Sequence, residues 1–410
     1  MKNVLFITYY FPPGASSGVF RPSKFVKYLK NGRDWNPVVL TMEEAYYAKC
    51  DPSLSKDVPE ELDIYRVDSL QPLPGSDDER FKKVYHQAHM PDSAFGGIMH
   101  FVLKGLEIIN NRQIDLIFCT IPHPSMAVVG MLLKQMTGIP LVVEYRDGWT
   151  TNPMMKPRTE EGRQVNQYME SRVLAAADGI VVVDEQLKQD VCSLGFKGEI
   201  EVILNGFDQD DFKNTDKYAF DRPQGGQIIS YCGHIYRDYI PALARMADAI
   251  SAWNERYGAE SPMKLYLAGE FQHVNDREVL LSKDHVSYEG HLNYRDSIAF
   301  TSSSDASVGV MTLEYSMGGK FYNLMLSDQY IFAFVNPRNE RIKQLLNDYT
   351  GKRFLPLDAP LGDIVQAIQE WNTSGGRKRE SYMPPGYLKE YSREQQTRQL
   401  EAVWNRIVGK

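Results

Sequence analysis

Cysteine is scarce in this sequence. Its 410 residues include four cysteines, which lie far apart and form no C-x-x-C pair: Cys50, Cys119, Cys192 and Cys232. Disulfide-rich domains and structural zinc sites need cysteines that are closely spaced or numerous, so neither is expected here. The pattern is typical of a protein from a reducing compartment.

Long apolar segments are missing as well. No run approaches the ~18 apolar residues of a membrane-spanning helix. The first apolar run, Val4 to Thr8, is too short for the core of a signal peptide and is typical of a buried first strand. We expect a cytoplasmic protein that is either free or bound peripherally at the inner face of the membrane.

The sequence also lacks an excess of basic residues. Its 46 Lys and Arg residues and 53 Asp and Glu residues give a formal net charge of −7. Non-specific nucleic-acid binding depends on a basic surface, so we do not expect it to be the main role. The hydrophobic fraction of 43% is close to the average of globular proteins. The chain length indicates two or three domains.

What the sequence contains is a regular alternation of strand and helix patterns. Most strand candidates are uninterrupted apolar runs, as expected for parallel strands covered on both faces. The first half has predicted strands at 3–8, 38–41, 63–67, 115–119, 141–145, 179–183 and 200–204, and helices at 22–30, 96–111, 125–136, 160–176 and 185–194. The second half has predicted strands at 228–231, 264–268, 285–288, 306–310 and 330–334, and helices at 241–253, 295–302, 320–325 and 340–347. This alternation predicts two doubly wound α/β domains.

Two segments stand outside the alternation. Residues 205–227 carry Asn-Gly, several aspartates, Arg-Pro and Gly-Gly, a composition typical of an interdomain linker. The last helix begins with a capping box at Ser392 and Gln395. Its apolar stripe must be buried against one of the two domains: Leu400, Val403, Trp404 and Ile407.

A glycine- and serine-rich turn, Gly14 to Gly18, follows the first predicted strand and precedes the first helix. Backbone N–H groups at such a junction suit a phosphate. Neither the Gly-Lys-Ser/Thr of a Walker loop nor G-x-G-x-x-G is present. A tight turn with no ligand is the alternative.

Four basic residues lie on one side of the first helix: Arg21, Lys24, Lys27 and Lys30. One interpretation is attraction to an anionic membrane surface. The alternative is an ordinary solvated helix face.

Charged residues also follow the strand at 141–145. Arg146 can pair with a phosphate, and Asp147 can accept a proton or a sugar hydroxyl, at the edge where open α/β sheets bind ligands. The alternative is an Arg–Asp pair that only holds the loop together. In the second half, glycine and a cation occur together twice, as Gly233 with Arg237 and as Gly318-Gly319-Lys320. Both places suit a diphosphate.

In their order these motifs resemble the GT-B glycosyltransferases, specifically the family-4-like group. The resemblance covers nearly the whole chain and rests on several short segments: 9–18, Tyr145 to Trp149, Ala177 to Ile180, Asn205 to Asp208, Tyr231 to Tyr236, Leu267 to Gly269, Gly319 to Asn323, and Tyr391-Ser392. It implies two facing Rossmann-like domains with a deep interdomain cleft. Residues 1–207 with the C-terminal helix 393–410 would form the acceptor-side domain, and residues 208–392 the domain that binds the nucleotide-sugar donor.

The resemblance also implies a reaction: retaining transfer of a sugar from a nucleotide-diphosphate sugar, without metal or other cofactor, to a glycan or lipid-linked acceptor in cell-surface or exopolysaccharide synthesis. The implied catalytic residues are Arg146, Asp147, Arg237 and Lys320. The implied donor-binding residues are Gly14, Gly18, Gly233, Gly290, Tyr294, Gly319, Lys320 and Asn323. The family's pair of glutamates is degenerate in this chain, with Asn323 at the second position and Tyr315 at the first, next to Glu314.

Other hypotheses remain open at this point. A nucleotide-sugar epimerase or hydrolase would share the fold, although the acidic and aromatic insertion at 43–100 suits an acceptor site better. A non-catalytic partner subunit would explain the degenerate glutamates. A Rossmann oxidoreductase is disfavoured because the first strand lacks the dinucleotide fingerprint.

Overall fold

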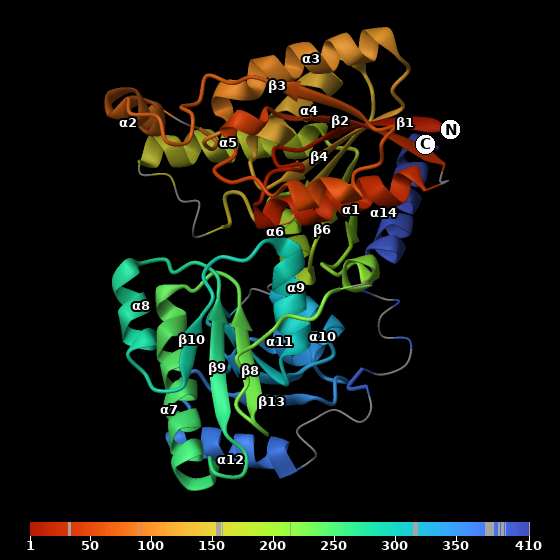
Figure 1. Ribbon diagram of the computed structural model, residues 1–410. Helices are drawn as coiled ribbons and strands as arrows, with labels where there is room; N and C mark the ends of the chain where they lie inside the picture. The colour runs from red at the N-terminus through yellow and green to blue at the C-terminus, as the bar shows by residue number, and fades with distance from the viewer. Residues whose placement is uncertain are drawn as a thin grey trace. The chain divides into compact units, whose positions relative to one another are not determined.

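The computed structural model describes residues 1–31, 34–88, 90–152, 157, 159–213, 215–314, 319–373, 381–383, 386, 389 and 391–409 (Figure 1). The chain divides into two compact units. Unit 1 contains Met1–Asn205 together with Arg393–Lys410, and unit 2 contains Gly206–Ser392. Tyr315, Ser316, Met317 and Gly318, which precede Lys320, lie outside the described residues.

Unit 1 is built on a parallel sheet with the strand order β3-β2-β1-β4-β5-β6-β7. Its strands are β1 (Lys2–Ile7), β2 (Trp35–Met42), β3 (Asp63–Val67), β4 (Leu116–Ile121), β5 (Leu141–Tyr145), β6 (Gly179–Val182) and β7 (Glu199–Val202). Its helices are α1 (Phe20–Lys30), α2 (Glu79–Ala88), α3 (Ile98–Asn111), α4 (Ser125–Thr137), α5 (Glu160–Ala176), α6 (Glu185–Ser193) and α14 (Arg393–Val408).

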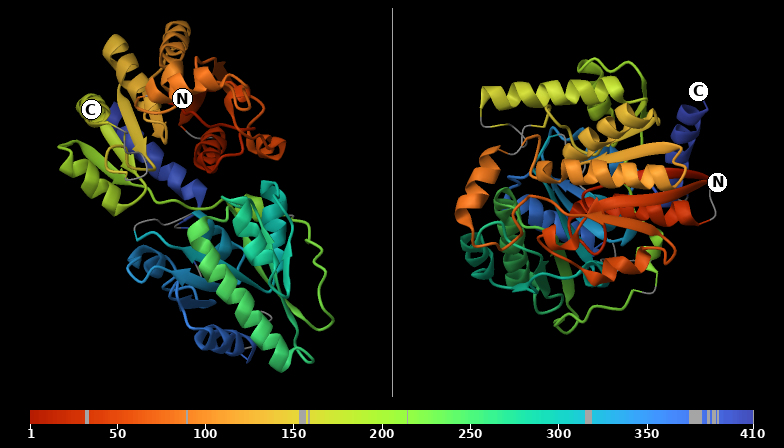
Figure 2. Two further views of the ribbon diagram at one scale, coloured as in Figure 1. Left: turned by 90° about the vertical axis from the view of Figure 1, so that its left-hand side faces the viewer. Right: turned by 90° about the horizontal axis from the view of Figure 1, so that it is seen from above.

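Both faces of this sheet are covered, which explains the uninterrupted apolar runs of its strands. Along β1, Leu5 and Ile7 pack in the core shared with α3 and α4, whereas Val4 and Phe6 pack in the core shared with α1 and α14. Helix α14, at the blue end of the chain, lies beside α1 (Figures 1 and 2). Its predicted apolar stripe is buried there, and the Trp404 ring contacts the rings of Trp35 and Phe118.

Unit 2 has a second parallel sheet with the order β10-β9-β8-β11-β12-β13. Its strands are β8 (Gln227–Cys232), β9 (Met263–Ala268), β10 (Val286–Tyr288), β11 (Ala306–Met311), β12 (Tyr330–Val335) and β13 (Lys352–Leu355). Its helices are α7 (Ile240–Tyr257), α8 (Val274–Leu281), α9 (Tyr294–Ser303), α10 (Gly319–Leu326), α11 (Glu340–Leu345) and α12 (Leu361–Thr373). Helices α7 and α12 cover one face, and α9, α10 and α11 cover the other.

The predicted fold class is confirmed, because both sheets are parallel, Rossmann-like and covered by helices. Four elements were missed: α2, α8, β13 and α12. Helix α12 has an i, i+3, i+4, i+7 apolar pattern at Ile364, Ala367, Ile368 and Trp371, so periodicity could have found it. Strand β13 has four residues at the sheet edge and carries too short a pattern to be recognised.

The basic face predicted for α1 is not an exposed surface. Arg21 and Lys24 are buried, and the ammonium groups of Lys24 and Lys27 both lie near the Asp57 carboxylate. The reason is tertiary: α1 packs against β2, α14 and the short turn Pro52–Asp57, which supplies that carboxylate. Arg21 and Lys24 therefore cannot present their charges to a membrane. Within the described residues, no helix is long and apolar enough to span a bilayer.

Candidate functional site

Each sheet has one point where the strand order reverses direction along the chain. In unit 1 this switch point lies between β1 and β4, and in unit 2 between β8 and β11. Ligands of open α/β sheets bind at the carboxyl ends of the strands at such points, because the loops there diverge and leave backbone groups accessible. The predicted site residues fall mainly at these two edges, and each edge is described separately below.

In unit 2, Lys320 lies at the switch point. It is on the first turn of α10, which follows β11, and its Nζ lies 3.1 Å from the ring centroid of Tyr231 on β8. The ammonium nitrogen is buried and has no hydrogen-bond partner in the described part of the chain. Burial lowers the pKa of Lys320 to about 7, opposed by the neighbouring Cys232. A buried ammonium held only by an aromatic face is poised to pair with an anion.

The strand ends beside Lys320 carry glycines in the left-handed region. Gly233 (φ 134°), Gly269 (φ 123°) and Gly290 (φ 76°) follow β8, β9 and β10. A Cβ on Gly269 would stand 2.0 Å from the carbonyl oxygen of Gly233, so no side chain fits there. Together they leave the carboxyl edge of the sheet as bare backbone. Gly233 and Gly290 are among the donor-binding residues predicted from the sequence, whereas Gly269 is not.

The backbone N–H of Gly233 was predicted to bind the donor, but it is engaged within the protein. It donates to the carbonyl of Ala268 at 2.9 Å, and the Gly269 N–H donates to Gly290 at 2.7 Å. The donors that suit an anion are instead at the start of α10. Gly319 begins this helix, and no described atom outside its own helix and its chain neighbours lies within 4 Å of where its Cβ would stand. The first amides of a helix have no partner within the helix, so they suit an anion.

Other predicted residues of unit 2 have partners of their own. The Arg237 side chain is 70% exposed, and its Nε lies 3.8 Å from the Asp276 carboxylate. The Tyr294 hydroxyl donates to Asp211 at 2.8 Å. Glu314 pairs with Arg338 at 3.1 Å. Asn323, one turn after Lys320, is half-buried, and its side-chain amide makes no hydrogen bond within the described residues.

In unit 1, the Gly14–Gly18 loop is closed by its own hydrogen bonds. Gly14 N–H donates to Phe11 O at 3.0 Å, and Gly18 N–H donates to the Ser16 hydroxyl at 3.3 Å. A Cβ on Gly18 would stand 2.6 Å from the Tyr10 ring, so this glycine is required by packing. The two predicted phosphate donors are therefore engaged by neighbouring protein atoms, and neither glycine has the positive φ that a tight turn would require.

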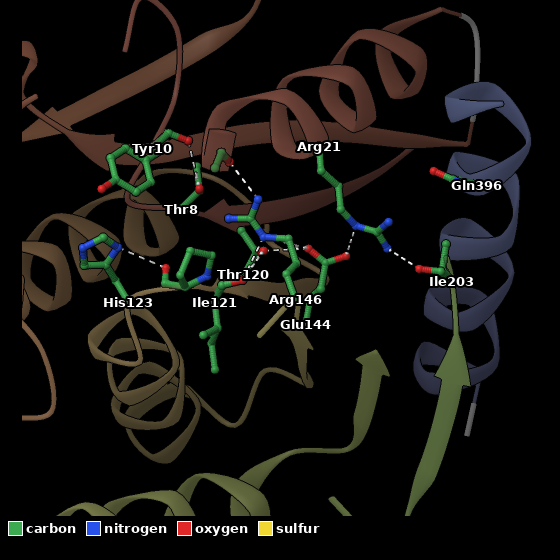
Figure 3. A network of polar contacts seen from close by, with 12 residues as sticks. Thr8, Tyr10, Arg21, Thr120, Ile121, His123, Glu144, Arg146, Ile203 and Gln396 are labelled. Atoms are coloured by element: carbon green, nitrogen blue, oxygen red, sulfur yellow. Dashed lines mark hydrogen bonds and ion pairs between the residues drawn. The ribbon is translucent and has the colours of Figure 1, made fainter. Parts of the chain in front are cut away.

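Arg146 and Glu144 belong to a buried polar network at the end of β5 (Figure 3). Glu144 accepts from Arg21 Nε at 2.8 Å and from the Thr120 hydroxyl at 2.6 Å. Arg21 also donates to the carbonyls of Ile203 and Leu204, the last residues before the end of the unit 1 segment. Every atom of the Glu144 carboxylate thus has a partner, which is what a buried charge requires.

The loop after Arg146 is fixed to α5. The Trp149 indole donates to Asn166 at 2.8 Å, and the Thr150 amide donates to Glu170 at 3.1 Å. Asp147 lies in this anchored loop and is exposed at its tip. Neighbouring protein atoms nevertheless raise the pKa of its carboxyl, opposed by the Arg146 guanidinium. Arg146 and Asp147 therefore do not form the closed pair of the alternative interpretation, since no ion pair between them is found in the described residues.

Sequence reasoning missed the aromatic group at this edge. The His123 ring, just after β4, stacks on Tyr9 at 4.0 Å and meets Tyr10 edge-on at 5.1 Å. His123 has φ 76°, unusual for a residue other than glycine, and follows the Ile121-Pro122 segment. Burial lowers its pKa, so the imidazole is neutral near pH 7. Its position at the switch point would have been the only clue.

The described residues contain no group of three His, Cys, Asp or Glu side chains placed to hold a metal ion.

Comparison with known proteins first defines the class of fold. Sucrose-phosphate synthase from Thermosynechococcus elongatus matches with a TM-score of 0.66 at 14% identity, covering 100% of both chains. HepE of Anabaena, in complex with UDP and glucose, matches with a TM-score of 0.62 at 14% identity, covering 99% of this chain and 100% of that one. A UDP-N-acetylglucosamine 2-epimerase matches with a TM-score of 0.57 at 12% identity, covering 100% and 97%. The fold is GT-B.

A family model then narrows the class. The model of Glycosyltransferase Family 4 matches residues 62–211, which lie mainly in unit 1. Together with the GT-B fold, this match confirms the resemblance to family-4-like glycosyltransferases. A search of curated protein sequences found no match.

Proposed function

We propose that this protein is a retaining glycosyltransferase. It would move a sugar from a nucleotide-diphosphate donor, bound at the β8/β11 edge of unit 2, to a glycan or lipid-linked acceptor bound by unit 1. The transfer would be a step in the synthesis of a cell-surface polysaccharide or an exopolysaccharide. The family match over 62–211 and the UDP complex of HepE, which shares the fold, support this assignment.

The single observation that carries the proposal is the Lys320 ammonium. It is buried at the switch point of unit 2, without a hydrogen-bond partner among the described residues, beside the first amides of α10 and the glycines at 233, 269 and 290. A diphosphate placed there would pair with this ammonium and with the amides. When the glycosidic bond of the donor breaks, negative charge develops on the departing diphosphate, and a prearranged cation stabilises that charge without reorganisation.

The first experiment identifies the donor. A thermal-shift screen with UDP, GDP, ADP, dTDP and their common sugar conjugates should reveal one base that raises the melting temperature, because ligand binding to the native state stabilises it by mass action. With the donor known, Lys320→Ala should lower turnover roughly 10²–10³-fold, about 3–4 kcal/mol of transition-state stabilisation. Lys343→Ala is the matched control, because Lys343 is an exposed lysine of the same unit that pairs with Glu340.

Turnover by the Lys320→Ala variant equal to that of the wild type would show that Lys320 does not bind the diphosphate. Retention would be checked by the anomeric coupling constant of the product in proton NMR. Metal independence is part of the proposal and would be checked by activity that persists in excess EDTA.

A second candidate is a nucleotide-sugar epimerase, because an epimerase shares this fold over the full length of the chain. The two functions differ in whether an acceptor is needed. An epimerase converts the donor alone, whereas a transferase consumes it in proportion to acceptor. If none of the nucleotides binds, a non-catalytic partner subunit is favoured instead. Glu314 is already paired with Arg338, and Asn323 stands where the family's second glutamate is expected.

A further inference from the structure

The Arg146 guanidinium is held rigidly with one nitrogen left over. Its Nε donates to Ile121 O and its Nη1 donates to Gly18 O, both at 2.8 Å. The side chain is 9% exposed. No hydrogen bond engages Nη2 within the described residues, and this nitrogen is not sealed in the interior. The ends of β4 and β5 and the turn Ser17–Val19 before α1 therefore place one N–H₂ group at the edge of the sheet.

The positive charge of Arg146 has no carboxylate of its own. Glu144 Oε2 lies 4.0 Å from Nε, but Glu144 already accepts from Arg21 and Thr120. Asp147, the next residue, is exposed and makes no ion pair with it in the described chain. Burial lowers the pKa of Arg146 despite these two carboxylates. A buried guanidinium whose charge is only partly balanced favours an added anion.

The free side of Arg146 faces Tyr10 and His123. In Figure 3 the remaining guanidinium nitrogen points to the side of the network where these two residues lie. Burial raises the pKa of Tyr10 and lowers the pKa of His123; the charge of Arg146 opposes the first shift and adds to the second, which places both residues within its electrostatic reach. His123 Nδ1 lies 3.2 Å from Pro122 O, a distance at which its N–H donates, and this leaves Nε2 as an acceptor.

Asp92, another carboxylate near this edge, already accepts hydrogen bonds from the protein. Asp92 raises the pKa of His123, but its oxygens accept from the Ser125 amide at 2.7 Å, the Ser125 hydroxyl at 3.0 Å and the Ala94 amide at 2.7 Å. It therefore caps the start of α4 and is not a partner of Arg146. On this side of Nη2, Figure 3 shows the side chains of Thr8, Tyr10 and His123, and the imidazole of His123 is neutral near pH 7.

We propose that the unbonded Nη2 of Arg146 is an anion subsite for the acceptor, so that the acceptor carries a carboxylate or a phosphate close to the sugar that receives the transfer. Two N–H groups of Nη2 would bond the anion, and Nε2 of His123 would accept from a neighbouring sugar hydroxyl. A neutral acceptor would leave the guanidinium unbalanced. This inference depends on the proposed function in one respect, that the bound molecule is called the acceptor. The subsite itself lies wholly in unit 1 and does not involve Lys320.

The test compares three sugars that differ in one group: methyl glucoside, methyl glucuronoside and glucose 6-phosphate. Their dissociation constants would be measured by NMR titration of the full chain without nucleotide, at low and at moderate salt. We expect at least one of the two anionic sugars to bind about tenfold or more tightly than the neutral one. Which of them binds more tightly separates a carboxylate acceptor from a phosphate acceptor.

Variants locate the effect. Arg146→Gln should abolish the preference and leave weak binding of methyl glucoside unchanged, whereas Arg163→Gln, which alters an exposed arginine on α5, should keep it. If Arg146→Gln does not fold, His123→Trp takes its place, because His123 lies within electrostatic reach of Arg146 and a larger ring there should hinder binding of the anion. Equal binding of the three sugars, or a preference that survives in the variant, would overturn the inference. Nucleotide binding that fails in the separate screen would overturn only the proposed function.

Discussion

Lys320 and Arg21 show two opposite ways in which a buried cation is accommodated. Arg21 is fully bonded to Glu144 and to two backbone carbonyls. In the part of the chain that the structure describes, the Lys320 ammonium contacts the Tyr231 ring and has no hydrogen-bond partner. Full pairing marks a group that holds the fold together, whereas an unpaired buried charge costs stability and is retained where a ligand completes it. The two residues therefore lead to different predictions.

Nucleotide binding should depend on pH through Lys320. Its pKa is about 7 in the free protein, and contact with diphosphate oxygens would raise it, so the complex takes up a proton above pH 7. The affinity for the nucleotide should fall as the pH rises from 7 to 9, approaching tenfold per unit. Calorimetry across this range measures the slope. Lys320→Arg should flatten it, because arginine stays charged, and a flat slope in the wild type would contradict the prediction.

The Arg21–Glu144 pair should contribute strongly to stability. Both side chains are at most 2% exposed, so Glu144→Gln leaves the Arg21 guanidinium without its counter-ion in the interior. We expect a loss of about 3–5 kcal/mol in the free energy of unfolding, measured by urea denaturation. Arg163→Ala removes half of an exposed pair and should leave stability unchanged. A comparable loss in both variants would show that burial is not the cause.

At the scale of elements, the ends of parallel strands carry the chemistry in both units. The end of β5 continues into a loop tied to α5, and the ends of β8, β9 and β10 finish in glycines. The helices that follow supply amides and side chains at the same edge. This arrangement explains why residues far apart in sequence, such as Gly18, Ile121 and Arg146, are joined by hydrogen bonds.

The glycine row in unit 2 should be sensitive to a single methyl group. Gly269→Ala adds a Cβ that would stand 2.0 Å from Gly233 O, which would push apart the ends of β8 and β9. We expect a marked loss of nucleotide affinity together with reduced stability. Gly225→Ala is the control, because it has a positive φ of 70° but open space around the added carbon. Equal effects of both substitutions would point to backbone strain alone.

At the scale of the whole molecule, the chain leaves unit 1 after Asn205 and returns to it at Arg393. On the unit 2 side of these crossings, Phe207 N–H donates to Tyr391 O at 3.1 Å, so the outgoing and returning segments are bonded to each other. Unit 2 is therefore one continuous stretch of sequence. Unit 1 is completed only by the last helix, α14.

Fragments should behave accordingly. Residues 206–392 should fold alone and bind the nucleotide, whereas residues 1–205 should not unfold cooperatively. The fragment 1–205 lacks Leu400, Val403, Trp404 and Ile407, whose burial is worth about 1.5–3 kcal/mol each, together comparable to the stability of a whole domain. Circular dichroism with urea denaturation measures both fragments. A peptide of residues 393–410 should restore cooperative unfolding to 1–205, and its failure to do so would contradict this account.

Much of the fold could be predicted from sequence because its strands are buried on both faces. Burial on both sides enforces uninterrupted apolar runs, and these are visible without coordinates. The glycines at strand ends and the capping box before α14 are likewise local requirements of the backbone. Local pattern also predicts a phosphate site at the cation near the start of α10, and this stays a prediction.

Only the tertiary structure decided how each polar group is used. The basic residues of α1 were predicted to form a surface, but α1 packs against Pro52–Asp57 and α14, and Arg21 and Lys24 are buried. The amides of Gly14, Gly18 and Gly233 were predicted to bind phosphate, but in the folded chain they donate to carbonyl and hydroxyl oxygens. Glu144 became the counter-ion of Arg21, and His123 joined Tyr9 and Tyr10. Sequence alone determined the strands and their alternation with helices, because these depend on local pattern. Pairing and burial depend on which segments meet, and distant parts of the chain determine that.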